Sequence, residues 1–430
     1  MNQFKNFFAK IGRGIQKAFR AVVKWVRSLF TKDKMEELAA FYRKKGTKSF
    51  MASLLCILFG IFVGFVVMLI LSFTMEGLSV GDAFHGLVII LLGPFTGMAQ
   101  YIATGFGDMI FYAAPLIMTG LSVAIAFKTG LFNIGAPGQF LMGTMGSLLV
   151  ALNIRTGGGF AGIMVWLLAL VVGTLCGMLW GAIPGIFKAF LNVNEVIVCI
   201  MTNWIAANIV SWVFSGMRHI INTGNGKAGY LITTAQTGNG TPTLFLDKLF
   251  PGSYIDIGII LAIAIAILIG IMLNKTTFGY EIKACGYNRY GAKYAGMSEK
   301  KNIVYSMMIA GALSAVGGAL YYLNPGIEFH FASAYQTLPD YGFNGIPVAL
   351  LASNNPIGVI FSGLFLRYLA KGGDNLVDAG FNRYISDIIV AIVIYLAGFS
   401  KLILEVLQKR RQKRDLKKAQ AAEEKGGNPQ

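Results

Sequence analysis

The chain has 430 residues, of which 55% are hydrophobic and only 13% are charged. A soluble domain of this length cannot cover that much apolar surface, because exposed apolar patches on soluble proteins are small. The apolar runs are continuous and about 20 residues long, which is typical of membrane helices and not of membrane β-strands. The composition therefore excludes a soluble protein and predicts an all-α polytopic membrane protein.

The net charge of +17 is concentrated at both ends of the chain and in one internal segment. Of the 37 Lys and Arg residues, 13 lie in residues 1–49, six in residues 275–301 and nine in residues 401–430. Positive charges beside membrane spans mark the cytoplasmic side and attract anionic lipid headgroups. The charge is therefore attributed to membrane topology, and no nucleic-acid partner is expected.

The amino-terminal residues 4–30 place apolar and basic positions on opposite faces of a helix. This pattern predicts a helix in the membrane surface, although a calmodulin-binding helix has the same pattern. We assign residues 1–49 to this basic amphipathic cytoplasmic segment, residues 50–406 to a transmembrane domain and residues 407–430 to a basic cytoplasmic tail.

Ten membrane spans are predicted, with both termini in the cytoplasm. In chain order they cover residues 50–73, 109–127, 131–152, 163–187, 196–214, 255–273, 303–323, 342–352, 357–370 and 385–404. On this topology 30 Lys and Arg residues are cytoplasmic and seven are outside, a strong bias in the expected direction. The longest polar loop, residues 217–253, is then extracytoplasmic.

A Phe-Asn pair with a nearby Gly and Pro opens both the third and the eighth span. The pairs are Phe132-Asn133 and Phe343-Asn344. The two spans run in opposite directions, so the similarity predicts an inverted repeat of spans 2–5 and 7–10. Gly and Pro interrupt helices, and the backbone groups that they free inside a membrane need neighbours, water or a ligand. Interrupted helices of this kind form transporter substrate sites.

The candidate substrate-binding residues are the polar and aromatic side chains in or near these interrupted helices. They are Phe132, Asn133, Gln139, Asn203, Phe343 and Asn344. For each amide taken alone, a hydrogen bond between helices is an alternative explanation.

Chemistry of other kinds has little support in the sequence. The chain has no G-x-x-x-x-G-K-[ST] loop, which binds ATP phosphates in many ATPases. Its three His residues lack metal-ligand spacing, and no nucleophile and base are paired. We therefore expect no catalytic residues, no metal and no bound cofactor in this chain.

The segment 275–301 lies between the sixth and seventh spans and is predicted to be cytoplasmic. Within it Tyr287, Tyr290 and Tyr294 recur at helical spacing among basic residues. Exposed aromatic side chains with basic neighbours suit docking into a groove on a partner protein. The alternative is a solvated basic loop that only sets the topology.

Four segments of the chain resemble the permease subunits of bacterial ABC importers for nucleosides, within the wider simple-sugar and branched-chain amino-acid permease group. They are residues 119–139, residues 194–197 with Asn203, residues 284–296, and residues 341–351 with Asn355-Pro356. Together they extend over residues 109–398. The sequence departs from the family at Pro137, where an acidic residue is usual, and in the long basic amino terminus.

The resemblance implies an ATP-driven importer in the bacterial plasma membrane, with two permease subunits, two cytoplasmic ATPases and an extracytoplasmic substrate-binding lipoprotein. This chain would be a permease that moves nucleosides by alternating access, with ATP and Mg held by the partner ATPases. The interrupted helices themselves lead to the hypothesis that Phe132 or Phe343 stacks on a base, while Asn133, Gln139 and Asn344 hydrogen bond to base or ribose. The residues similar to the ATPase-coupling helix are Gly286, Tyr287, Asn288, Tyr290, Ala292, Tyr294 and Gly296.

Several alternatives to nucleoside import stay open. Within the group, the substrate would be a simple sugar or a branched-chain amino acid. An ion-coupled secondary transporter would need membrane-buried carboxylates, whereas the acids here lie mostly at loops and helix ends. A non-transporting receptor is disfavoured by the interrupted helices.

Overall fold

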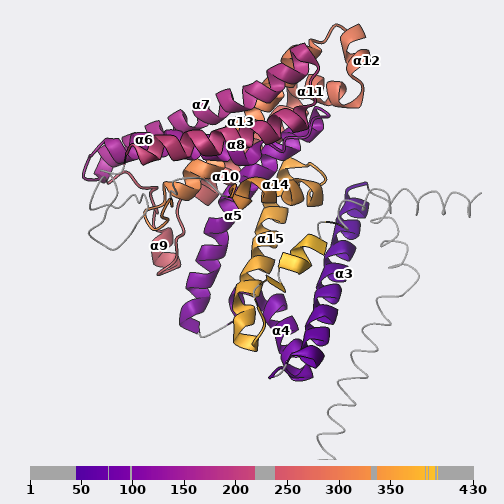
Figure 1. Cartoon of the computed structure of the whole chain (residues 1–430), viewed down its shortest axis with the longest axis vertical. Coiled ribbons are helices and arrows are strands. Elements are labelled where there is room, and N and C mark those ends of the chain that lie inside the picture. Colours follow the sequence, from indigo (N-terminus) through magenta and orange to yellow (C-terminus); the bar gives the residue numbers. More distant parts are fainter. Residues whose placement is uncertain are drawn as a thin grey trace, which may run out of the picture. The chain divides into compact units, whose positions relative to one another are not determined.

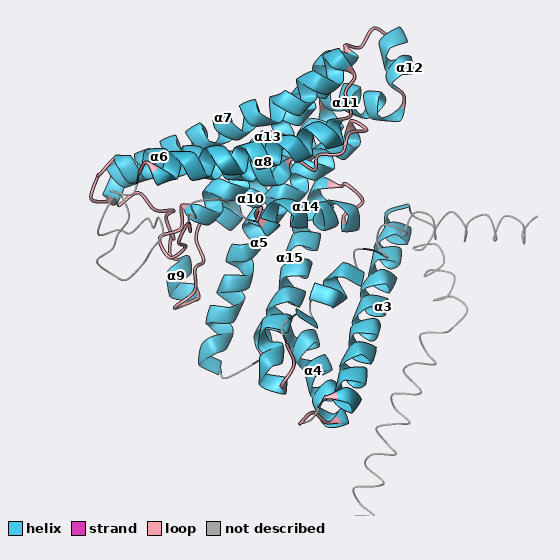
Figure 2. Cartoon of the chain, viewed as in Figure 1, coloured by secondary structure: helices cyan, strands magenta, loops and turns pink. Residues whose placement is uncertain are grey.

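The computed structural model describes residues 45–75, 77–96, 99–217, 238–330, 337–382, 384–385, 387–392 and 395. These residues form helices joined by turns and loops, with no β-strand among them (Figure 1, Figure 2). The all-α class is thereby confirmed for this part of the chain. The described residues between Phe59 and Gly398 belong to one compact unit. The predicted amphipathic helix and basic tail lie outside the described residues.

Six helices in the described ranges are long and apolar enough to cross a membrane, and a bent helix pair counts as a seventh. The six are α3 (Lys45–Thr74), α5 (Ala99–Lys128), α7 (Gly159–Leu191), α8 (Glu195–Ser215), α10 (Gly258–Lys275) and α13 (Glu299–Tyr322). They correspond to the first, second and fourth to seventh predicted spans. The chain is thus a multi-pass membrane protein. The total of ten spans and the cytoplasmic termini stay predictions, since the last span is only partly described.

The third predicted span, α6 (Ala136–Asn153), begins five residues later than expected. The intervening residues 131–135 form a turn that follows Gly130, whose φ is +74°. Pro137 stands in the first helical turn, where its missing N–H would have no helical partner in any case. A shorter apolar helix, α4 (Val80–Leu92), lies between the first and second predicted spans.

The bent pair consists of α14 (Asp340–Leu351) and α15 (Pro356–Asp374), and the chain direction bends by 119° between them. Two residues in the turn, Ser353 and Asn354, adopt left-handed backbone conformations. The turn predicted around Asn354 is therefore confirmed. The 12 residues of α14 extend about 18 Å, well short of a hydrocarbon core of about 30 Å.

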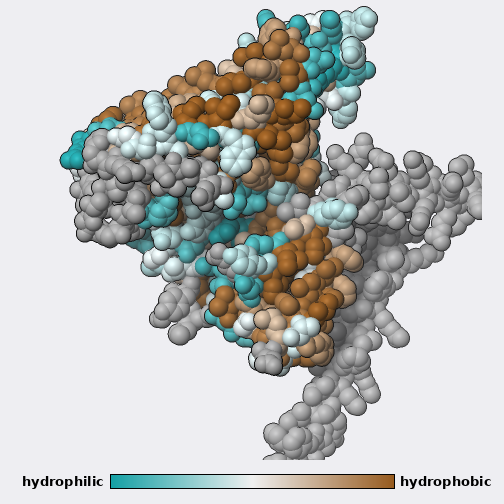
Figure 3. Space-filling model, viewed as in Figure 1, coloured by the Kyte–Doolittle hydropathy of each residue, from teal (hydrophilic) through white to brown (hydrophobic). Residues whose placement is uncertain are grey.

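Close helix packing depends on small residues, as is common in membranes. Gly318 of α13 lies against Phe140 of α6, and Gly345 of α14 lies against Thr119 of α5. In the predicted repeat, α5 and α6 begin the first half, and α13 and α14 begin the second half. The first helix of each half thus contacts the second helix of the other half. This exchange of partners supports the inverted repeat. Hydrophobic residues cover much of the surface of the described helices on the face that Figure 3 shows.

Candidate functional site

The turn between α5 and α6 is held by a reciprocal pair of buried amides. Asn133 Nδ2 donates to Gln139 Oε1 at 2.8 Å, and Gln139 Nε2 donates back to Asn133 Oδ1 at 3.1 Å. Asn133 Nδ2 also donates to Ser122 Oγ at 3.1 Å, and the Gly135 N–H donates to Asn133 Oδ1. The protein itself therefore supplies hydrogen-bond partners for both amides.

Asn203 fastens α8 to the same turn. Its Oδ1 accepts a hydrogen bond from the Gly138 N–H at 2.9 Å, and its Nδ2 donates to the Ile134 carbonyl at 2.9 Å. It thus satisfies one of the N–H groups that a helix start leaves unpaired. Phe132 lies nearby with its ring stacked on Phe127, at 5.3 Å between centroids. The predicted substrate-binding residues around the first interrupted helix therefore contact other protein groups at the turn.

The two interrupted helices meet each other. A Cβ atom added to Gly342, near the start of α14, would come within 2.5 Å of Pro137 N in the first turn of α6. Beside this contact, the rings of Tyr341 and Phe140 stack at 6.2 Å with only 7° between their planes. The two similar sequence motifs, separated by about 200 residues of chain, are therefore neighbours in space.

A cavity of about 490 Å³ lies beside α14, between α5, α15 and the helical residues after 384. Its polar lining residues are Asp340, Tyr341, Asn344, Arg367 and Asp387. Leu116 also lines it and stands 12 residues before Lys128, at the predicted cytoplasmic end of α5. At 1.5 Å per residue the cavity is about 18 Å from that end, near the middle of the membrane.

Asn344 is the predicted substrate-binding residue that lines this cavity, while Phe343 beside it is 37% exposed. Asn344 and Asp340 are both exposed and stand one turn apart. Polar side chains at membrane depth face a bundle interior or a water-filled space, because lipid cannot solvate them. This face of α14 is therefore expected to border a water-filled path or a partner subunit.

Arg367 was placed outside the membrane by the charge count, but it stands within α15 and lines the cavity. Its guanidinium lies 4.5 Å from the Tyr112 ring centroid, and its Nη2 is 3.8 Å from Asp374 Oδ2. A lone Arg in the apolar run 357–370 was the sequence signal for a residue that faces the protein interior or a cavity, because such residues seldom face lipid.

Aromatic side chains form a wall next to the cavity, and the sequence analysis did not identify them. The rings of Tyr321 and Tyr341 lie 4.7 Å apart, and Phe111 stacks on Tyr321 at 5.8 Å. Their signal was the cluster of aromatic residues that precedes Gly342 and ends α13. In the part of the chain that the structure describes, no group of three His, Cys, Asp or Glu side chains could hold a metal ion.

The predicted coupling segment forms two short helices, α11 (Thr277–Tyr287) and α12 (Arg289–Tyr294). The expected helical run between Gly286 and Gly296 is thus broken at Asn288, whose Oδ1 accepts from the Gly291 N–H and caps α12. The segment extends past the ends of α7, α8 and α13 and has a hydrophilic surface (Figure 1, Figure 3).

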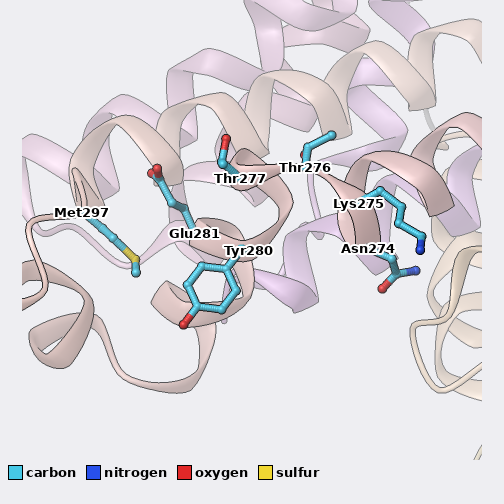
Figure 4. Close-up of a pocket in the computed structure, with 7 residues that line it drawn as sticks. All are labelled: Asn274, Lys275, Thr276, Thr277, Tyr280, Glu281 and Met297. Atoms are coloured by element: carbon cyan, nitrogen blue, oxygen red, sulfur yellow. The ribbon is translucent and has the colours of Figure 1, made fainter.

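The tyrosines of this segment are almost fully exposed. Tyr287 is 92% exposed, Tyr290 78% and Tyr294 94%, whereas Ala292 is buried. Large aromatic side chains in this state are typical of docking surfaces and seldom of free loops. Beside them a hollow of about 550 Å³ opens between the end of α10 and α11 (Figure 4). Its lining residues include Tyr280, Glu281 and Met297.

The coupling segment touches the α5–α6 turn directly. Gly286 packs so closely on Lys128 and Gly130 that any Cβ atom would run into the Lys128 carbonyl. Arg289 Nη2 donates to the Gly130 carbonyl at 3.4 Å. On the other side, Asn302 of α13 donates to Glu281 at 2.9 Å. A movement of α11 would therefore reach both the turn and α13.

Comparisons with known proteins give the same assignment along most of the chain. Residues 105–398 match the family described as "Branched-chain amino acid transport system / permease component". The guanosine ABC transporter permease protein NupP of Bacillus subtilis is 34% identical over 361 residues, which are 84% of this chain and 96% of that protein. No solved structure matches the chain.

Two further relatives have related descriptions. The nucleoside ABC transporter permease protein NupB of Lactococcus lactis is 32% identical over 88% of this chain and 98% of its own length. The glucose ABC transporter permease protein TsgB13 of Haloferax volcanii is 30% identical over 67% of this chain and 75% of its own length. The chain belongs to the family of branched-chain amino acid transport system permease components.

Proposed function

We propose that the chain is the permease subunit of an ATP-driven importer that moves nucleosides into a bacterial cell by alternating access. The observation that carries this proposal is the cavity beside α14, which is lined by polar groups and on the predicted topology lies near the middle of the membrane. The nucleoside assignment is supported by the relatives NupP and NupB, whose names include guanosine and nucleoside and which match over nearly their full length.

The energy would come from ATP that a separate cytoplasmic ATPase hydrolyses. The exposed tyrosines of α11 and α12 would seat in a groove of that ATPase, and the hollow beside Glu281 would receive a protruding part of it. A second permease subunit would cover the polar face of α14. An extracytoplasmic binding lipoprotein would deliver the substrate.

A continuous set of contacts links the docking segment to the cavity. It runs from Gly286 to Gly130, through the amide-tied turn to Pro137, and from Pro137 to Gly342 at the start of α14. Packed interiors transmit displacement because they contain few voids. A shift of α11 on ATP binding would therefore move the helix that carries Asp340 and Asn344.

Competition for uptake tests the substrate class. Cells that express the complete transporter take up labelled guanosine, and excess unlabelled nucleosides, glucose or leucine is added in turn. We expect other nucleosides to compete and both glucose and leucine to leave uptake unchanged. Leucine or glucose transport without guanosine transport would overturn the nucleoside assignment.

A further inference from the structure

The first five residues of α14 present a carboxylate and an amide to the cavity beside this helix. Asp340 and Asn344 stand four residues apart, so their side chains share one face of the helix. Both line the cavity and both are exposed. Within the described ranges, neither side chain has an ion pair or a hydrogen bond. Asp340 was not among the residues that the sequence pattern singled out.

An ionised carboxylate accepts hydrogen bonds and donates none. The ligand group that suits Asp340 is therefore rich in O–H or N–H donors. A vicinal diol offers two hydroxyl donors at a spacing that one carboxylate can accept, and acidic residues bind ribose hydroxyls in this way in dinucleotide-binding folds. The cavity of about 490 Å³ falls in the usual range for small-molecule sites.

The other charged groups of the cavity do not favour an anionic ligand. Among the described lining residues, the acid Asp340 and the base Arg367 are the charges to consider, because the second acid, Asp387, has an interaction of its own within the protein. The positive charge of Arg367 is already shared with Asp374 at 3.8 Å and with the Tyr112 ring. A ligand carboxylate, which every amino acid carries, would face like charge at Asp340, and like charges at close range are unfavourable.

We propose that Asp340 binds the vicinal hydroxyls of a ribonucleoside, with Asn344 as a second contact to the same ligand. This inference rests on the proposed function, which supplies the nucleoside, and it adds the residue that recognises the sugar.

The test compares ribonucleosides with 2′,3′-dideoxynucleosides in vesicles that contain the complete transporter. Asp340→Asn keeps the shape of the side chain and removes its charge, and Asp340→Glu keeps the charge. The matched control is Asp247→Asn, an exposed acid in the first turn of another helix, away from the cavity. Transport is measured with saturating binding lipoprotein, and the amount of permease in the membrane is quantified for each variant.

We expect the Asp340→Asn variant to transport the ribonucleoside about 10- to 100-fold more slowly, the range for one hydrogen bond to a charged group. Dideoxynucleoside transport should change little, so the ratio between the two ligands falls. The Asp340→Glu variant should retain part of the preference and the control all of it. An unchanged ratio in Asp340→Asn overturns the inference while nucleoside transport stands. A wild-type transporter that moves no nucleoside overturns the proposed function itself.

Discussion

At the scale of single residues, the amide pair Asn133–Gln139 stabilises the turn between α5 and α6. Each amide satisfies the other, and together they connect Ser122 of α5 to the first turn of α6. Removing one partner would leave several buried polar groups unpaired, and each such group costs about 1–3 kcal/mol. The pair therefore fixes the turn on which the coupling segment rests.

Asn133→Ala is expected to lower the stability of the protein more than the transport rate of each folded molecule. The change strands Gln139, Ser122 and the Gly135 N–H, so the amount of folded protein and its thermal midpoint in detergent should both fall. Asn208→Ala is the control, because Asn208 is exposed and its side chain donates to the Trp204 carbonyl of its own helix at 2.8 Å. Equal stability of the two variants would contradict a structural role for Asn133.

At the scale of elements, α11 connects the segment that carries the exposed tyrosines to the α5–α6 turn. Gly286 permits this contact because it has no Cβ atom, and Gly130 opposite it adopts a left-handed φ of +74°. The element is short, and it is tied to α13 through Asn302. The α5–α6 turn and α13 therefore both hold α11, and a displacement of α11 would reach both of them.

Gly286→Ala should weaken the link between ATP hydrolysis and transport. The added methyl group would push α11 away from the Lys128 carbonyl, which is backbone and cannot rotate aside. We expect the complex to assemble while substrate-stimulated ATPase activity and uptake fall together. Gly291→Ala in α12 is the control, because its Cβ would lie 3.4 Å from its nearest neighbour, the Asn288 side chain. Normal stimulation in Gly286→Ala would argue against this route.

The exposed tyrosines are expected to contribute most of the docking energy. Tyr287→Ala with Tyr290→Ala should reduce recovery of the ATPase in a pull-down, since an aromatic hot spot contributes about 2 kcal/mol or more, a factor of about 30 in affinity. Lys293→Ala in α12, the helix that carries Tyr290, should change the recovery by much less, because exposed charges contribute about 0–1 kcal/mol. A larger loss in the Lys293 variant would indicate that charge and not the aromatic surface determines docking.

At the scale of the whole molecule, the long apolar helices and their order could be predicted from the sequence. Hydrophobic length determines such spans almost alone, as α8 illustrates: residues 196–214 were predicted and Glu195–Ser215 is observed. The turn at 131–135 and the short α14 were recognisable only as irregular pieces, because Gly and Pro mark an interruption without giving its geometry.

The site was less predictable than the fold, for a physical reason. Asn133, Gln139, Asn203 and Asn344 are equivalent in a sequence, yet the first three bond to protein and the fourth lines a cavity. Which amide finds a partner depends on tertiary contacts between helices far apart in the chain. Asp340 and Arg367 were not predicted for a similar reason. Both line a cavity that forms only when α5, α14 and α15 pack together, and the sequence does not show that packing.

The most direct measurement is guanosine uptake into liposomes that contain the complete transporter, with ATP sealed inside and the binding lipoprotein outside. Uptake should require hydrolysable ATP, stop with a non-hydrolysable analogue, and continue when ionophores remove proton and sodium gradients. Uptake that runs on an ion gradient without ATP would contradict the account and make the protein a secondary transporter.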